Sequence, residues 1–108
     1  METKKTPIEL LKEFAPEFEQ NQMNEKALLF DNEKYQAVPK QYKLLAGIAV
    51  AAALGSDTCV RMWTMQARKA GITTGEIVEA IMVARYMKQA TVNDTVAGTL
   101  ELISENKL

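Results

Sequence analysis

The chain has 108 residues, a length typical of one domain with one core, and its 13 basic and 14 acidic side chains give a net charge of −1. It contains no histidine and one cysteine, which excludes a Ser-His-Asp triad, a Cys-His pair, a histidine-ligated metal and an intrachain disulfide. We therefore expect a single domain over residues 1–108 that uses no metal or cofactor and binds neither nucleic acid nor membrane.

Two short helices are expected near the N-terminus. Thr6 and Glu9 flank Pro7 in the pattern of a capping box, which predicts a helix over residues 7–14. Pro16 opens a second helix that is expected to reach about residue 30. Residues 31–38 are polar and mixed in composition, and we expect a loop there.

A tight pair of helices is predicted in the middle of the chain. Pro39 begins the first helix, which contains the apolar run of residues 44–54 and ends at Gly55. This run is too short to span a membrane, which takes about 20 residues. Ser56 caps the second helix, which runs over residues 57–70 and ends at Gly71. A connection of about two residues makes the pair antiparallel.

Two further helices are expected at the C-terminal end. Thr73 and Glu76 form a second capping box, which opens a helix that runs to about residue 87. A last helix is expected to start at Thr91 or Asn93. No stretch alternates between apolar and polar residues between turn signals. The sequence therefore predicts an all-α protein, a bundle of five or six helices around the central helical hairpin.

Apolar side chains outnumber the positions that so small a bundle can bury. The predicted helix over residues 57–70 has apolar side chains that point in several directions around its axis. These side chains are Val60, Met62, Trp63 and Met65. A chain of this size cannot bury a helix on every side. We expect a homo-oligomer in which helix faces pack between subunits.

Residues 38–87 resemble the carboxymuconolactone decarboxylase family, which includes the alkylhydroperoxidase D-like proteins. The resemblance lies in a Pro-Lys helix start, an alanine-rich helix, a Gly-Ser-Asp-Thr-Cys elbow, a Lys-Ala-Gly helix end and a following Thr-x-x-Glu-Ile helix start, which occupy residues 39–40, 44–54, 55–59, 69–71 and 73–77. It implies an all-α bundle that assembles as a trimer or hexamer and acts on a small molecule.

The site residues that this resemblance implies are largely replaced. The redox branch of the family uses Cys-x-x-Cys, a histidine four residues later and a glutamate upstream. Ser56 stands at the first cysteine position, Cys59 at the second, Trp63 at the histidine and Leu44 at the glutamate. The resemblance thus assigns Cys59 as the candidate catalytic residue and Ser56 and Trp63 as candidate binding residues, with no metal ligand.

Cys59 has two interpretations. It lies in the expected first turn of a helix, where unpaired N–H groups and the helix dipole favour a thiolate, and it would then react as a one-cysteine nucleophile toward peroxide. Alternatively, it is a small buried hydrophobic residue. Trp63 is likewise either a pocket residue or part of the core or a subunit interface. A lone cysteine without a secretory signal also indicates a cytoplasmic protein.

Three functions stay open from the sequence. The first is a thiol-dependent antioxidant that reduces hydroperoxides through Cys59, an activity of the peroxiredoxin type. The second is a lyase for a small lactone or carboxylate, of the 4-carboxymuconolactone decarboxylase type, in which Glu79 or Lys43 replaces the missing histidine as proton donor. The third is a non-catalytic oligomeric binding protein on the same fold. Whether the chain is an enzyme is therefore undecided at this point.

Overall fold

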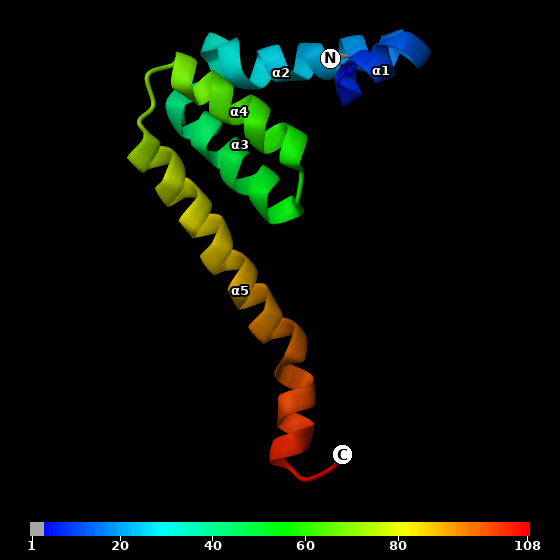
Figure 1. The fold of residues 1–108 in the computed structure, drawn as a ribbon, viewed down its shortest axis with the longest axis vertical. Coiled ribbons are helices and arrows are strands. Elements are labelled where there is room, and N and C mark those ends of the chain that lie inside the picture. The colour runs from blue at the N-terminus through cyan, green and yellow to red at the C-terminus, as the bar shows by residue number, and fades with distance from the viewer. Residues whose placement is uncertain (1–3) are drawn as a thin grey trace. The chain divides into compact units, whose positions relative to one another are not determined.

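The computed structural model describes residues 4–108, and its regular structure over that range is entirely helical (Figure 1). The elements in chain order are α1 (Pro7–Phe14), α2 (Pro16–Asp31), the 3₁₀ turn η1 (Glu33–Tyr35), α3 (Lys40–Leu54), α4 (Asp57–Lys69) and α5 (Thr74–Ser104). The all-α prediction is confirmed. The chain divides into two compact units, residues 1–43 and residues 44–108, and a single domain over residues 1–108 stays a prediction.

The first unit begins with the expected capping box. The Glu9 N–H donates to Thr6 Oγ1 at 3.2 Å, and the Thr6 N–H donates to Glu9 Oε2 at 3.0 Å. These two bonds satisfy backbone donors that the first turn of a helix otherwise leaves unpaired. Pro7 and Pro16 then lie in the first turns of α1 and α2, where their missing N–H groups are not needed.

The Lys43 side chain connects the end of α2 with η1. Its Nζ donates to the backbone carbonyl of Leu29 at 2.6 Å and to the carbonyl of Tyr35. An ion pair of 2.8 Å between Lys40 and Asp31 spans the same loop. Lys43 therefore satisfies carbonyls left over where α2 and η1 end, and this role argues against its use as a proton donor.

The central hairpin forms as the sequence predicts, with only two residues between α3 and α4. Gly55 has φ +78°, a conformation that costs an L residue energy and suits glycine. The Ser56 N–H donates to Ala51 O at 2.9 Å and the Gly55 N–H donates to Ala52 O at 3.2 Å, the pattern of a Schellman motif. Gly71, at φ +83°, ends α4 in the same way.

The second unit has a small core of aliphatic side chains. On α3 the buried residues follow the spacing i, i+4 and i+7, which places them on one face of the helix. The buried side chains of residues 44–108 are Leu44, Ile48, Ala51, Ala67, Ile72, Ile77 and Ala84. Much of the apolar surface of α3 is left outside this core, because Val50 is 56% exposed and Leu54 is 78% exposed.

The expected break near residue 90 does not exist. A single helix, α5, runs through residues 74–104 (Figure 1). The Thr91 hydroxyl donates to the Lys88 carbonyl at 2.6 Å, and the Thr95 hydroxyl donates to the Thr91 carbonyl at 2.8 Å. Thr91 thus bonds back to the preceding turn and caps nothing. The helix continues because no glycine or proline lies between residues 76 and 97.

Within residues 4–108, every helix is too short or too polar to traverse a lipid bilayer.

Candidate functional site

The first turn of α4 holds two of the predicted site residues. Ser56 is the N-cap, and its Oγ accepts a hydrogen bond of 3.3 Å from the Cys59 N–H. The hydroxyl therefore contacts the backbone of Cys59 and fixes where that residue sits in the first turn. Ser56 and Cys59 are brought together as neighbours of a helix cap. That the pair forms a catalytic or binding site stays a prediction.

The Cys59 side chain is half-buried and carries a free thiol. The nearest basic side chain along the helix is Arg61, whose guanidinium donates to the Asp57 carboxylate at 2.9 Å. Both partners of this pair are largely exposed, so it contributes little stability. It also directs the positive charge of Arg61 to Asp57.

Trp63 lies one turn after Cys59 and faces α3. A Cβ placed on Gly47 would lie 3.5 Å from Cδ2 and 3.6 Å from Cγ of the indole. The ring therefore lies against the backbone of α3 at its one glycine, which holds the two helices together. This contact supports the interpretation of Trp63 as a packing residue.

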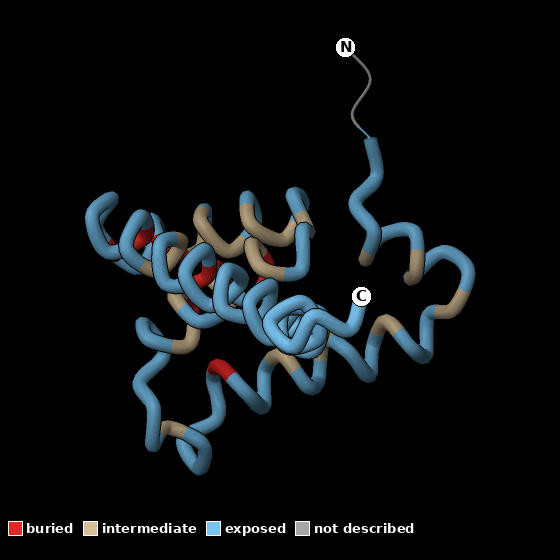
Figure 2. The backbone as a smooth tube through the Cα atoms, turned by 90° about the horizontal axis from the view of Figure 1, so that it is seen from below, coloured by how far each residue is buried: buried red, intermediate tan, exposed pale blue. Residues whose placement is uncertain are grey.

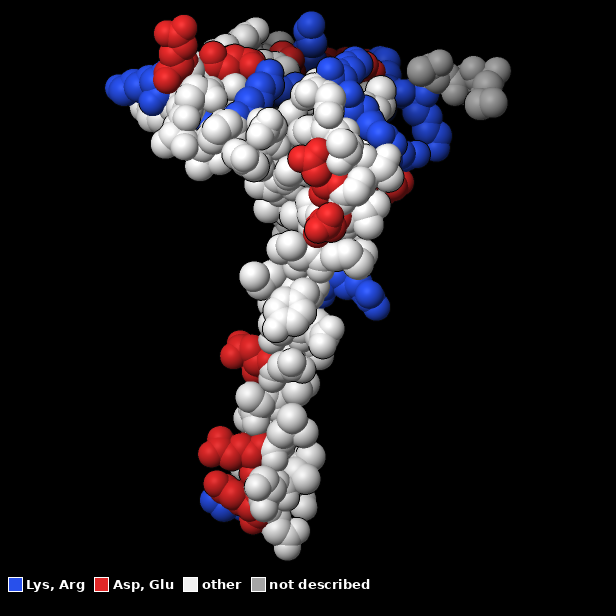
Figure 3. All heavy atoms as spheres, turned by 90° about the vertical axis from the view of Figure 1, so that its left-hand side faces the viewer, with Lys and Arg blue, Asp and Glu red and all other residues white. Residues whose placement is uncertain are grey.

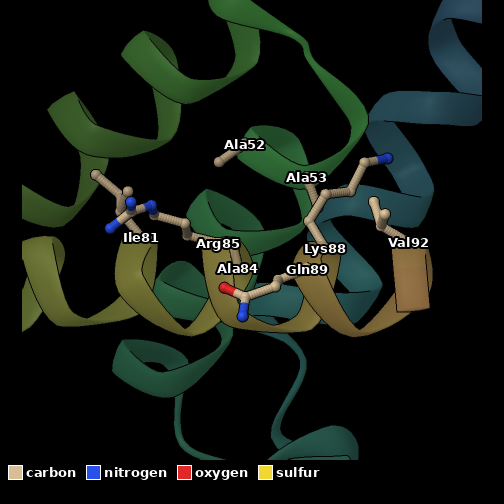
Figure 4. A pocket seen from close by; sticks show the side chains of 8 residues that line it. All are labelled: Ala52, Ala53, Ile81, Ala84, Arg85, Lys88, Gln89 and Val92. Atoms are coloured by element: carbon tan, nitrogen blue, oxygen red, sulfur yellow. The ribbon is translucent and has the colours of Figure 1, made fainter. Parts of the chain in front are cut away.

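An apolar groove of about 470 Å³ runs between the end of α3 and the middle of α5 (Figure 4). Its floor is made of small or aliphatic side chains, and the basic side chains of Arg85 and Lys88 extend from it in opposite directions (Figure 4). The lining residues are Ala52, Ala53, Ile81, Ala84, Arg85, Lys88, Gln89 and Val92. We call this cavity the basic groove.

A second cavity of about 400 Å³ lies along the same two helices and carries two carboxylates. It is lined by Leu45, Ala46, Ala49, Glu76, Glu79, Ala80 and Val83. We call it the acidic groove. Glu76 accepts hydrogen bonds from the backbone and hydroxyl of Thr73, both 2.9 Å long, and they lower its pKa, the backbone bond most. The ionised Glu76 carboxylate therefore serves as part of the cap of α5. Glu79 is the other carboxyl group that lines this cavity.

Cys59, Ser56 and Trp63 line neither groove. The candidate catalytic residue and the two cavities therefore lie apart. Leu44, at the glutamate position of the resemblance, is 2% exposed and belongs to the core. Over residues 4–108, His, Cys, Asp and Glu side chains do not gather in threes in a way that could hold a metal ion.

The basic groove was not recognised in the sequence. Its α5 residues Ile81, Arg85, Lys88 and Val92 have spacings of four, three and four, which place them on one helical face. The spacing is visible in the sequence. It extends, however, across the break that the sequence predicts between a helix ending at about residue 87 and a last helix starting at Thr91 or Asn93. A break there would have put Val92 on a different element.

The comparisons with known proteins bear on the family and the fold. The model of the carboxymuconolactone decarboxylase family matches residues 21–97, well over half of the chain and beyond both ends of the segment that carries the resemblance. A crystal structure of a protein from Methanobacterium thermoautotrophicum, a structural-genomics target, is 27% identical with a TM-score of 0.73, over 82% of this chain and 92% of that chain. None of the curated proteins matches this sequence. On the family match and the shared fold, this chain belongs to the carboxymuconolactone decarboxylase family.

Proposed function

We propose that this protein reduces hydroperoxides at the expense of external thiols, with Cys59 as the reacting residue. The observation that carries the proposal is the position of Cys59, three residues after the Ser56 N-cap in the first turn of α4. Backbone N–H groups and the positive end of the helix dipole at such a turn favour negative charge on a sulfur atom. The half-buried side chain leaves part of that residue open to solvent.

The reaction needs one sulfur and two equivalents of a thiol. The Cys59 thiolate attacks one oxygen of the hydroperoxide, the O–O bond breaks, and the other oxygen leaves as an alcohol after taking up a proton. Sulfur is oxidised to the sulfenic acid. A first external thiol converts the sulfenic acid to a mixed disulfide with release of water. A second thiol then regenerates the Cys59 thiol and leaves as part of a disulfide of the two external thiols.

Because the sequence has no second cysteine, the thiol that reduces the sulfenic acid of Cys59 must come from another molecule. The sequence contains only Cys59, so no intrachain disulfide can resolve the sulfenic acid. The resolving sulfur is therefore that of a small thiol or of another protein molecule. Histidine is also missing from the chain, and the peroxide oxygen takes its proton from water or from the thiol.

The test is peroxide consumption by the full chain with dithiothreitol as the thiol. We expect consumption above that of dithiothreitol alone, loss of the excess in Cys59→Ser, and no change in Thr58→Ala, which alters the preceding exposed residue and leaves the cap intact. Trapping with dimedone should label Cys59 after peroxide treatment. A Cys59→Ser variant as active as the unmodified chain, or an unmodified chain without excess consumption, contradicts the proposal.

A second function has support from the acidic groove. Glu79 lines this cavity together with the Glu76 carboxylate and the apolar side chains of Leu45 and Ala49, and a carboxyl group is one of the side chains that can transfer a proton to a bound substrate. This arrangement supports a lyase for a small lactone or carboxylate. Its signature is turnover of a 4-carboxymuconolactone-type substrate that survives Cys59→Ser and is lost in Glu79→Gln. If neither activity is found, the alternative of a non-catalytic binding protein is favoured.

A further inference from the structure

The basic groove lies entirely within the second unit, where α5 changes from a partly buried to an exposed helix. Ala84 in its floor is 6% exposed, whereas every residue from 85 to 104 is exposed (Figure 2). The floor also contains Ala52 and Ala53. Because these alanine side chains are short, about 470 Å³ stays open between the two helices. That volume lies in the range of about 300–1,000 Å³ that small-molecule sites occupy.

The groove carries positive charge that the chain does not neutralise. From residue 80 to residue 93 of α5 the only charged side chains are Arg85 and Lys88, and residues 44–54 of α3 carry no charge. In Figure 3, basic atoms on the middle of α5 lie between acidic side chains nearer its two ends. Within residues 4–108 neither Arg85 nor Lys88 forms an ion pair. The basic side chains that do so are Lys5, Lys40, Arg61 and Lys107.

The basic rim and the apolar floor together define the chemistry of a ligand. A guanidinium binds a carboxylate through two parallel N–H···O bonds, which favours a carboxylate over a neutral head group. Gln89 lies one turn after Arg85 on the same helical face and adds an amide donor. The floor offers only hydrocarbon side chains, so the remainder of the ligand must be apolar. The lining extends about 16 Å along α5 from Ile81 to Val92, a length that suits an unbranched chain.

We propose that the basic groove binds a free medium-chain aliphatic carboxylate, with the carboxylate at Arg85 and the hydrocarbon chain across Ala53 and Ala84 toward Val92. Figure 4 shows Arg85 and Val92 toward opposite ends of the groove. Lys88 extends away from Arg85, so its methylene groups cover the hydrocarbon chain while its ammonium group stays in water. Cys59 does not line this groove, and binding is therefore independent of the peroxide reduction proposed above.

The acidic groove provides an internal comparison. It lies along the same two helices, has a similar volume of about 400 Å³ and is lined mainly by apolar side chains, but it carries Glu76 and Glu79. These carboxylates repel an anion, whereas Arg85 and Lys88 attract it. An aliphatic carboxylate therefore enters the basic groove alone, because charge distinguishes two cavities of similar size and apolar character.

Calorimetric titration of the full chain with decanoate, below the concentration at which it forms micelles, measures the binding. We expect saturable binding at one site per chain near neutral pH. Arg85→Gln should raise the dissociation constant on the order of 10-fold, because it removes a charged hydrogen-bond donor. Arg68→Gln removes the same charge from an exposed position of α4 outside the groove and should leave the dissociation constant unchanged. Equal affinities of the Arg85→Gln variant and the unmodified chain overturn the proposal.

A second pair of variants tests where the hydrocarbon chain lies. Ala53→Phe fills the floor and should abolish decanoate binding. Leu54→Phe adds the same ring at the next residue, which is 78% exposed and lines neither groove, and should have no effect. Far-UV circular dichroism establishes that both variants are folded. Binding retained by a folded Ala53→Phe variant contradicts the placement, and if this variant does not fold, the comparison of Arg85→Gln with Arg68→Gln decides.

Decanol separates the effect of charge from that of apolar area. It has the same hydrocarbon chain with a neutral head group, and we expect it to bind at least about 10-fold more weakly than decanoate. Equal binding of the two compounds would show that the groove accepts apolar molecules regardless of charge, which contradicts the role of Arg85. A chain that binds no decanoate, including one whose groove is covered by another protein chain, also overturns the proposal.

Discussion

The indole ring of Trp63 lies on the backbone of α3 at Gly47, with 3.5 Å between the indole Cδ2 and the position of an added Cβ. This contact joins the two helices of the hairpin near their middle. At the position to which the resemblance assigns a histidine, this chain has a ring that covers a glycine of the opposite helix.

A first prediction follows for Gly47. A methyl group added at this position meets the ring at ordinary van der Waals distance, so Gly47→Ala should fit and should raise the free energy of unfolding by about 0.5–1 kcal/mol through helix propensity. Gly47→Leu cannot fit without moving the indole and should lower it by about 1–3 kcal/mol. Urea denaturation followed by Trp63 fluorescence measures both, and equal stability of the two variants contradicts this account.

Ser56 provides a second prediction. Its Oγ accepts the Cys59 N–H, so Ser56→Ala should lower the free energy of unfolding by about 1 kcal/mol. Ser56→Asp keeps an acceptor at the N-cap and should retain most of the stability. Thermal unfolding by circular dichroism compares the three proteins. A Ser56→Ala variant as stable as the unmodified chain would show that the cap contributes nothing.

Two threonines on α5 give opposite expectations. Thr73 caps the helix, and Thr73→Ala should cost about 1 kcal/mol. Thr91 lies inside the helix and bonds back to Lys88, so Thr91→Ala should be neutral or stabilising by about a few tenths of a kcal/mol. The two variants are matched in chemistry and differ only in position. If Thr73→Ala and Thr91→Ala lower the denaturation midpoint by the same amount, Thr91 acts as a helix cap and its assignment to the interior of α5 is wrong.

The capping box of α5 should respond to acid. Hydrogen bonds from Thr73 lower the pKa of Glu76 below its ordinary value of 4.5. Folding therefore favours the ionised form, and the stabilisation is present above about pH 4.5 and is lost as the pH falls through the lowered pKa. The stability difference between the unmodified chain and Glu76→Gln should be largest near neutral pH and shrink below about pH 4. A difference that does not change with pH contradicts this assignment.

Local signals in the sequence predicted the helix boundaries well. Both capping boxes, the two-residue elbow at Gly55 and Ser56, and the helix end at Gly71 form as expected, because each depends on backbone groups within a few residues. The break expected before Thr91 was wrong for a related reason. A threonine serves as a cap or bonds back to the preceding turn, and only the surrounding backbone selects between the two.

The candidate site was predicted only in part. The sequence placed Cys59 in the first turn of a helix, and the structure has it there. The sequence did not locate the two grooves, because each is lined by residues from α3 and α5 that are about 30 positions apart. No local pattern states which turn of one helix faces which turn of another.

The sequence by itself determined the all-α class, the caps and the elbow, since these depend on short-range hydrogen bonds and on the conformational freedom of glycine. Only the tertiary structure decided that Trp63 covers Gly47, that α5 is one continuous helix, and that its apolar half extends beyond the core of its own unit. These outcomes depend on how side chains from distant segments fill space, and that is decided by packing across the whole chain.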